Sequence, residues 1–264
     1  MTSNSDLRSL HSKIDSYYAK GYLDTWCGNV RKEWSEFLNR FFTILTKEFF
    51  KELKDEPRVL DIGCGPSISN IIAASSWSSH IILADFLESN RVEVRGFWRG
   101  PDDEYSYCFN WNHHFKFNGV LELNPNISDI ESRTRNAIRG VYFCDVLNDE
   151  SMFLVEDSKV INQDSRIKAD VVIASLVLDV VALNHKTFLR ALINVSKCLK
   201  PNGIILLQGS LGESIYTVGS AVFPVMNIDE LGLKKIFYEA SMNVLKWETT
   251  THITTHYFAV LRMK

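Results

Sequence analysis

The segment that most constrains the fold is a short apolar strand that runs directly into a glycine turn. Residues Val59–Pro66 have the sequence Val-Leu-Asp-Ile-Gly-Cys-Gly-Pro. A strand that ends in Gly-x-Gly lets the backbone approach a ligand where a side chain would collide. The next apolar run, His80–Asp85, ends in an acid that is placed to accept both hydroxyls of a ribose. Together these features predict a nucleotide-type cofactor site.

The residues around the glycines indicate which cofactor to expect. Dinucleotide sites usually carry a third glycine, in the pattern Gly-x-Gly-x-x-Gly, whereas here Pro66–Ser69 follow Gly65. Asp61, just before the glycines, would repel a phosphate but suits the ammonium group of an amino-acid moiety. S-adenosylmethionine carries that ammonium, a ribose and no phosphate, and it is the cofactor that we expect.

Strand-like and helix-like segments alternate along the chain, which is typical of a parallel sheet with helices on both faces. We expect parallel strands at residues 58–62, 80–85, 140–145, 169–175 and 203–208. Two β-rich runs at 243–249 and 252–262 are separated by two threonines, which predicts a terminal hairpin. The expected fold class is α/β: a doubly wound, mostly parallel seven-stranded sheet with an antiparallel terminal strand.

Two segments are expected to be additions to this sheet within one domain, residues 1–264. Residues 30–54 carry apolar side chains at helical spacing, so we expect an N-terminal helical lid over about residues 8–54. Residues 99–139 are rich in aromatic side chains in their first half, which predicts an inserted cap that carries substrate specificity. A packed surface loop is the alternative for this second segment.

Composition limits the partners of the chain. A formal net charge of -3 gives no chain-wide attraction to nucleic acid or to an anionic membrane. The five cysteines form no Cys-x-x-Cys pair, which fits a reducing compartment better than a disulfide framework. No apolar run approaches the roughly 20 residues that span a bilayer. We therefore expect a cytoplasmic, monomeric protein that binds neither nucleic acid nor membrane.

Several motifs together resemble one family. The glycine turn, Asp85–Asn90 (DFLESN) and Gly209–Tyr216 (GSLGESIY) are similar to the nicotinamide/phenylethanolamine/indolethylamine N-methyltransferases, which are class I S-adenosylmethionine-dependent enzymes. The resemblance covers the chain from about Tyr22 onward. It implies an enzyme that methylates a small amine, with an arylalkylamine as the leading expectation. A macromolecular methyltransferase and a cofactor-binding relative without turnover are the alternatives.

The resemblance also implies a set of cofactor contacts. Asp85 would meet the ribose, Asp145 the adenine, and Tyr22 would close over the cofactor from the lid. Asp145 could instead cap a turn, and Ser175 could simply end a strand. Tyr17 and Tyr18 offer a competing register for the closing tyrosine. The family places tyrosines where Cys27 and Ser69 stand, so the contact that the tyrosine at Ser69 would make to the cofactor carboxylate stays open. The expected cofactor contacts are Tyr22, Asp61, Gly63, Cys64, Gly65, Ser69, Asp85, Phe86, Asn90, Asp145, Val146 and Ser175.

The chemistry of amine methylation points to carboxylates as catalytic groups. An alkylammonium must lose a proton before it attacks, so a carboxylate can both hold the cation and relay the proton. Glu213 and Asp179 match acids of the family and are the expected catalytic residues. An acid at a helix start for Glu213 and a loop cap for Asp179 are the alternatives. Trp111 and Tyr216 are the expected aromatic walls for the substrate.

Histidines near the C-terminus raise the question of a metal. His252 and His256 are four residues apart, but the run lacks the glutamate of a zinc-protease motif and is strand-like. We therefore expect no metal site. The same hairpin lacks an acid that the phenylethanolamine branch of the family carries, which argues against catecholamine specificity.

Overall fold

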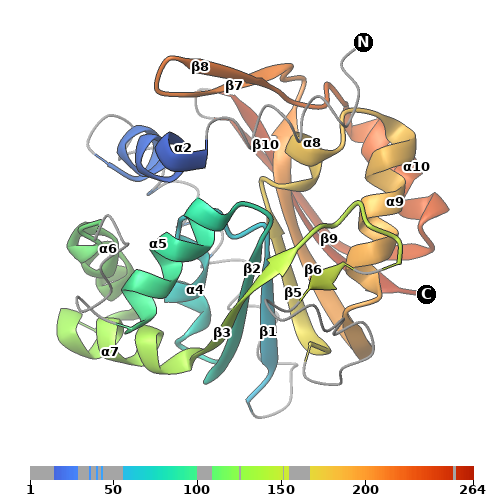
Figure 1. Ribbon diagram of the computed structural model, residues 1–264. Coiled ribbons are helices and arrows are strands. Elements are labelled where there is room, and N and C mark those ends of the chain that lie inside the picture. The colour runs from blue at the N-terminus through green and yellow to red at the C-terminus, as the bar shows by residue number, and fades with distance from the viewer. Residues whose placement is uncertain are drawn as a thin grey trace.

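A twisted β-sheet forms the middle layer of the molecule, and helices cover both of its faces (Figure 1). The computed structural model describes residues 15–28, 36, 40, 43, 56–99, 109–124, 126–150, 152–154, 167–251 and 254–264. Its main sheet has eight strands in the order β4-β3-β2-β1-β5-β6-β10-β9.

Five neighbouring strands of this sheet are parallel. They are β1 (Arg58–Ile62), β2 (His80–Asp85), β3 (Ile138–Cys144), β5 (Ala169–Ser175) and β6 (Leu199–Leu211). Their nearly continuous apolar sequences are typical of strands that are buried on both faces. The predicted parallel strands are therefore confirmed. Because parallel strands share one carboxyl edge, the glycine turn after β1 lies beside the acid that ends β2.

A terminal hairpin completes the sheet. β9 (Met242–Thr251) and β10 (Thr255–Met263) pair with each other, and β10 pairs antiparallel with β6. The predicted seven-stranded sheet with its antiparallel terminal strand is confirmed. The eighth strand, β4 (Phe153–Leu154), has only two residues and pairs antiparallel with the outer edge of β3.

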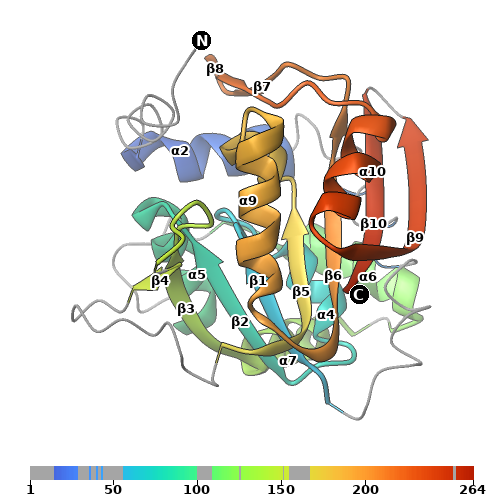
Figure 2. The ribbon, with the colours of Figure 1, turned by 90° about the vertical axis from the view of Figure 1, so that its right-hand side faces the viewer.

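Each face of the sheet has its own apolar core. Figure 2 views the molecule from the face that α9 (His185–Ser196) covers. On that face, the fully buried ring of Phe188 packs beneath the helices. On the other face, Ile71 and Phe115 are buried in the second core. The helices on the Phe188 face are α8 (Leu178–Val181), α9 (His185–Ser196) and α10 (Glu230–Glu239). The helices on the Ile71 face are α4 (Ser69–Ala74), α5 (Glu88–Arg99), α6 (Asn112–Glu122) and α7 (Ile127–Ala137).

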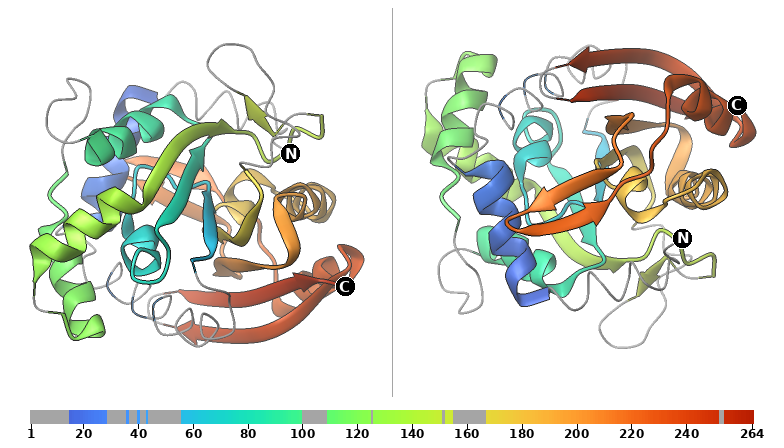
Figure 3. Two further views of the ribbon diagram at one scale, coloured as in Figure 1. Left: turned by 90° about the horizontal axis from the view of Figure 1, so that it is seen from below. Right: turned by 90° about the horizontal axis from the view of Figure 1, so that it is seen from above.

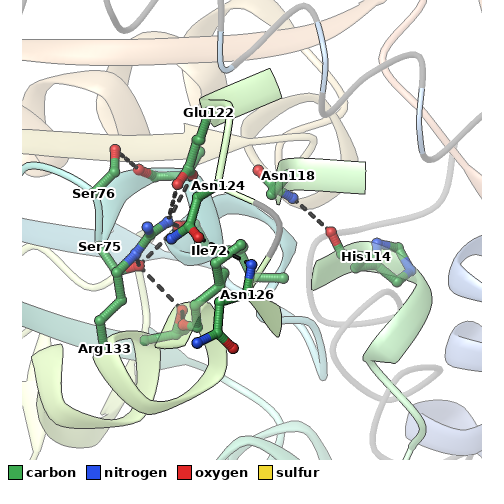
Figure 4. A network of polar contacts seen from close by, with 12 residues as sticks. Ile72, Ser75, Ser76, His114, Asn118, Glu122, Asn124, Asn126 and Arg133 are labelled. Atoms are coloured by element: carbon green, nitrogen blue, oxygen red, sulfur yellow. Dashed lines mark hydrogen bonds and ion pairs between the residues drawn. The ribbon is translucent and has the colours of Figure 1, made fainter. Parts of the chain in front are cut away.

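Helices α6 and α7 occupy most of the segment that we predicted to be a cap, and they pack beside α4. Figure 4 shows Arg133 of α7 between Glu122 of α6, 2.6 Å away, and Ser75 after α4, 3.1 Å away. This partly buried ion pair and hydrogen bond connect both helices to α4 at the side of the sheet. Residues 100–108 and 125 of the predicted cap lie outside the described residues, and a role of the whole segment over the substrate stays a prediction.

Two segments that are remote in sequence meet above the carboxyl edge of the sheet. They are α2 (Asp15–Tyr22) with the π-helix η1 (Leu23–Cys27), and the hairpin of β7 (Ile215–Val218) and β8 (Ala221–Pro224). Figure 3 shows α2 beside this hairpin. The predicted helix over residues 30–54 falls almost entirely outside the described residues. None of the helices that the structure describes has the length and apolarity needed to cross a membrane.

Candidate active site

A cavity of about 480 Å³ lies between the carboxyl edge of the sheet and these two covering segments. The turn after β1 and the ends of β2, β3, β5 and β6 form its floor, and η1 and β7 form its roof. The predicted residues that line it are Tyr22, Gly63, Cys64, Gly65, Ser69, Asp85, Phe86, Asn90, Asp145, Val146, Ser175, Asp179, Glu213 and Tyr216. Asp61 and Trp111 do not line it.

The glycine turn has a backbone conformation that favours glycine at two positions. Gly63 has a φ of +64°, and a Cβ atom there would lie 2.2 Å from Cγ2 of Val177. Gly65 has a φ of +61°, and a Cβ atom there would meet nothing within 4 Å. Gly63 therefore allows close packing against the turn after β5. Gly65 leaves backbone open toward the cavity, as a ligand that approaches the main chain requires.

The Asp85 carboxylate is held by three hydrogen bonds. One oxygen accepts from the Gly65 amide, and the other accepts from the Leu87 amide and from Nδ2 of Asn90, each at 2.9 Å. Burial raises the pKa of Asp85, and these three donors oppose that rise. Oδ1 of Asn90 is buried and has no hydrogen-bond partner. Carboxylate and amide oxygens together can accept the two hydroxyl protons of a ribose.

Asp61 lies behind the glycine turn rather than in the cavity wall. Its Oδ2 accepts from Nδ2 of Asn70 at 3.4 Å, and its Oδ1 is buried without a partner. Burial raises its pKa to about 8. Asn70 does line the cavity, so its hydrogen bond connects Asp61 to the cavity wall. A buried carboxyl oxygen without a partner suits a nearby cation.

Asp145 and Ser175 both make the local structural contacts that were the alternatives to cofactor binding, and both also line the cavity. Oδ1 of Asp145 accepts from the Leu147 amide at 3.0 Å, which is the capping role. The Ser175 hydroxyl ends β5 and donates to Oε1 of Gln208 at 2.9 Å. Both side chains nonetheless line the cavity, so the local structural role and the proposed cofactor contact are compatible.

The lid contributes Tyr22, Trp26 and Cys27 to the cavity wall. Burial raises the pKa of the Tyr22 hydroxyl far above its ordinary value, and it raises the pKa of Cys27 to about 12. Both groups are therefore neutral at pH 7. Sγ of Cys27 lies 3.9 Å from the Ser67 hydroxyl, which in turn donates to the Ser69 hydroxyl at 3.0 Å. Neutral donors thus stand where the family has tyrosines.

The two predicted catalytic acids line the part of the cavity beyond the glycine turn. Asp179, only 1% exposed, accepts from the Ser210 amide at 3.0 Å through Oδ2, while its Oδ1 has no hydrogen-bond partner. Burial raises its pKa. Glu213 lies half-buried in the turn between β6 and β7. Gly212, with a φ of +73°, opens that turn, and Asn227 donates to Ser214 at 2.9 Å across it.

Trp111 is placed differently from our expectation. Its side chain is 5% exposed and packs in the core beside the rings of Phe109, 4.7 Å away, and His114, 5.0 Å away. We therefore no longer place Trp111 against the substrate. The other predicted wall, Tyr216, does line the cavity, and its ring stacks on Phe223 at 5.0 Å.

Several cavity residues were not among the predicted site residues. They include Trp26, Gln208, Ser210, Val225, Thr254 and His256. The sequence period of a strand could have indicated two of them, because Gln208 and Ser210 are two residues apart on β6 and therefore face the same side of the sheet. Within the described ranges, no group of three or more His, Cys, Asp or Glu side chains is arranged to hold a metal ion.

Comparison with known proteins adds sequence relatives. The NNMT/PNMT/TEMT family matches residues 9–261. Human phenylethanolamine N-methyltransferase is 27% identical over 187 residues, which are 70% of this chain and 62% of that protein. Human nicotinamide N-methyltransferase is 24% identical over 245 residues, 91% of this chain and 87% of that protein. The chain thus matches less than two thirds of the length of the phenylethanolamine relative.

Solved structures resemble the fold. A SAM-dependent methyltransferase from Leishmania major has a TM-score of 0.60 at 12% identity, over 99% of this chain and 87% of that one. Magnesium protoporphyrin IX methyltransferase from Synechocystis, solved with bound SAM, has a TM-score of 0.59 at 10% identity, over 100% and 99%. At these identities the likeness establishes the fold.

The family match extends over nearly the whole chain, and it includes both the glycine turn and the β6–β7 turn that meet at the cavity. It confirms the family, fold and cofactor that the sequence motifs predicted. The chain belongs to the NNMT/PNMT/TEMT family, and its cofactor is S-adenosylmethionine.

Proposed function

We propose that this protein transfers the methyl group of S-adenosylmethionine to the nitrogen of a small amine, with an arylalkylamine as the expected class. One observation carries the proposal: Asp179 and Glu213 line the cavity beyond the cofactor motif, and none of the described lining residues is Lys or Arg. A wall of acids and neutral groups favours a cationic guest over a phosphate or a carboxylate. The N-methyltransferase relatives, one of which is named for the amine phenylethanolamine, support the same activity.

The cofactor fits the groups that surround the glycine turn. Gly65 would let the cofactor approach the protein backbone, and Asp85 with Asn90 would accept ribose hydroxyls. A bound ammonium group would favour the charged form of the buried Asp61 carboxyl, whose Oδ1 has no hydrogen-bond partner. When bound, the cofactor supplies a methyl group that is activated by a positively charged sulfur. Tyr22 and Trp26 can present aromatic faces to that charge and keep water away from it.

The two acids can orient and deprotonate the amine. Asp179 offers a buried oxygen without a partner, which an ammonium group would satisfy. Because burial raises the pKa of Asp179, this carboxylate is a stronger proton acceptor than an exposed one. Glu213, less buried and close to the covering hairpin, can hold the second side of the ammonium or pass the proton outward. Loss of that proton exposes the nitrogen lone pair for transfer.

The covering segments argue for a small molecule rather than a polymer. Nε1 of Trp26 donates to the Thr217 carbonyl at 2.9 Å, and the Gly219 amide donates to the Thr25 hydroxyl at 3.0 Å. These bonds tie η1 to the β7–β8 hairpin across the top of the cavity. The cavity volume of about 480 Å³ lies in the usual range of pockets for small ligands.

The proposal is tested by methyl transfer from labelled cofactor to a panel of amines. We expect Glu213→Gln and Asp179→Asn each to lower kcat/KM by about 100-fold or more, with an unchanged Kd for the cofactor. Glu230→Gln, on the exposed side of α10, is the matched control and should leave both constants unchanged.

Three outcomes would count against it. Unchanged transfer to every active amine in both acid variants would remove the catalytic assignment. Cofactor binding without transfer to any amine would indicate a relative without turnover. Label that appears only in polymers from a lysate would indicate a macromolecular substrate.

A further inference from the structure

Arg91 is a buried arginine behind the cavity wall that no step of the proposed reaction uses. It is 7% exposed, lies in the first turn of α5, and does not line the cavity. Its Nη1 donates to the Asp85 carbonyl at 2.9 Å and to the Phe86 carbonyl at 2.7 Å. These carbonyls belong to the last residue of β2 and to the residue that follows it. One guanidinium group therefore holds the main chain at the point where β2 delivers its acid to the cavity.

Both the burial of Arg91 and its place in the helix oppose a positive charge. Moving a charged group out of water is unfavourable unless partners compensate the loss. The first turn of a helix also carries the positive end of the helix dipole, which favours an acid such as Glu88 over a cation. An ion pair with Glu88 and the two carbonyls compensate these costs. Because an apolar side chain would incur neither cost, packing of α5 alone does not account for an arginine here.

The same guanidinium group supports an aromatic side chain of the cavity wall. Cζ of Arg91 lies 5.3 Å from the centre of the Phe143 ring, near the end of β3, which is within the range of a cation–π contact. The Phe143 ring in turn lies 5.5 Å from the ring of Phe86. Phe86 lines the cavity and packs against the small apolar cluster that Leu87 forms with the β7–β8 hairpin. Arg91 thus connects the ends of β2 and β3 to the cover of the cavity.

The charge of Arg91 also acts on the Asp85 carboxyl. Burial raises the pKa of Asp85, and the positive charge of Arg91 opposes this rise together with the three hydrogen bonds that the carboxylate accepts. A carboxylate is a stronger hydrogen-bond acceptor than a neutral carboxylic acid. The contacts to the main chain and the charge of Arg91 therefore favour the same outcome, an ionised Asp85 in a fixed position.

We propose that Arg91 is a positioning residue for S-adenosylmethionine, which fixes Asp85 and Phe86 from behind the cavity wall so that the carboxylate and the ring face the cofactor. This inference rests on the proposed contact between Asp85 and the ribose, and it does not depend on the identity of the amine. Arginine suits the role because its planar fork can reach two carbonyls and a carboxylate at once. The single ammonium group of a lysine supplies the charge but not that geometry.

The test measures the Kd of S-adenosylmethionine by isothermal titration of variants at this position. Arg91→Met keeps an apolar stem but removes the charge and the donors, and it should weaken binding by about tenfold or more. Arg91→Lys restores the charge, so it should recover part of this loss but not the wild-type Kd. Arg95 lies one turn later in α5 and pairs with the same Glu88 at 2.9 Å, which makes Arg95→Met the matched control. The control should keep the wild-type Kd.

A double variant separates positioning from a general loss of structure. In an Asp85→Asn background the carboxylate is already absent, so adding Arg91→Met should weaken binding by a smaller factor than it does in the wild type. A residue that only stabilises the fold would give the same factor in both backgrounds. Thermal unfolding of each variant reports its stability separately from its Kd.

A wild-type Kd in Arg91→Met would overturn the inference, and an equal loss in Arg95→Met or equal factors in the two backgrounds would do so too. If Arg91→Met does not fold, a folded Arg91→Lys protein with the wild-type Kd would overturn it. A wild-type Kd in Asp85→Asn would remove the proposed ribose contact and, with it, this inference. Because every reading is cofactor binding, failure to methylate any amine would contradict the proposed function alone.

Discussion

Replacing Asp85 with asparagine is expected to weaken S-adenosylmethionine binding by about 30- to 150-fold. The carboxylate accepts hydrogen bonds from Gly65, Leu87 and Asn90, each at 2.9 Å. An asparagine keeps one acceptor oxygen but turns an amino group toward one of these donors, so the glycine turn or the Asn90 amide loses its anchor. One hydrogen bond to a charged acceptor is worth about 2–3 kcal/mol, and each 1.4 kcal/mol is about tenfold in Kd.

The assay is isothermal titration of the free protein with the cofactor, together with thermal unfolding of each variant. Asp170→Asn is the matched control, because Asp170 accepts from the Arg58 amide at 2.8 Å and from Nζ of Lys200 at 2.5 Å at the opposite edge of the sheet. It should lose stability but keep the wild-type Kd. A Kd within threefold of wild type in Asp85→Asn, or an equal loss in the control, would refute the reasoning.

Three further changes probe other parts of the site. Gly63→Ala should abolish cofactor binding and lower Tm, because its Cβ would lie 2.2 Å from Val177 at a positive φ; calorimetry and circular dichroism measure both effects. Asp61→Asn should stabilise the free protein increasingly as pH rises from 4 to 8. The Asp61 carboxyl has a pKa of about 8 in the folded protein against an ordinary 3.8, so the wild type loses stability over that pH range and the variant does not. Tm measured against pH tests this, and a difference in Tm that does not change with pH would contradict it. Trp111→Ala should cost about 3–5 kcal/mol of unfolding free energy in urea titrations while the ratio of kcat/KM between amines stays constant.

The parts of the site that follow single strands could be predicted from the sequence. Gly63 and Asp85 each come directly after, or at the end of, an apolar run, and parallel strands bring their carboxyl ends to one edge. Their mutual position thus follows from strand identification alone. The hydrogen bond from the Gly65 amide to Asp85 confirms that the two strand ends are adjacent.

Residues whose position depends on remote packing could not be predicted in this way. Trp111 stands in an aromatic-rich segment, but only the tertiary structure shows that α6 turns it toward Phe109 and His114 in the core rather than toward a ligand. His256 is set opposite Ser210 by the register between β6 and β10, and the β7–β8 hairpin, α10 and β9 separate these two strands along the chain. A shift of one residue in that register would turn the imidazole to the other face.

The same two segments, η1 and the β7–β8 hairpin, cover both the proposed cofactor side and the proposed amine side of the cavity. Glu213 lies in the turn that leads into β7, and β7 accepts the Trp26 hydrogen bond at Thr217. Trp26 and Tyr22 belong to the lid segment that lines the cofactor side. In the mechanism that we propose, packing of this segment on a bound cofactor would support β7, the strand that follows Glu213. Glu213 would then be best placed when the methyl donor is already enclosed, which would favour transfer to the amine over loss of the methyl group to water.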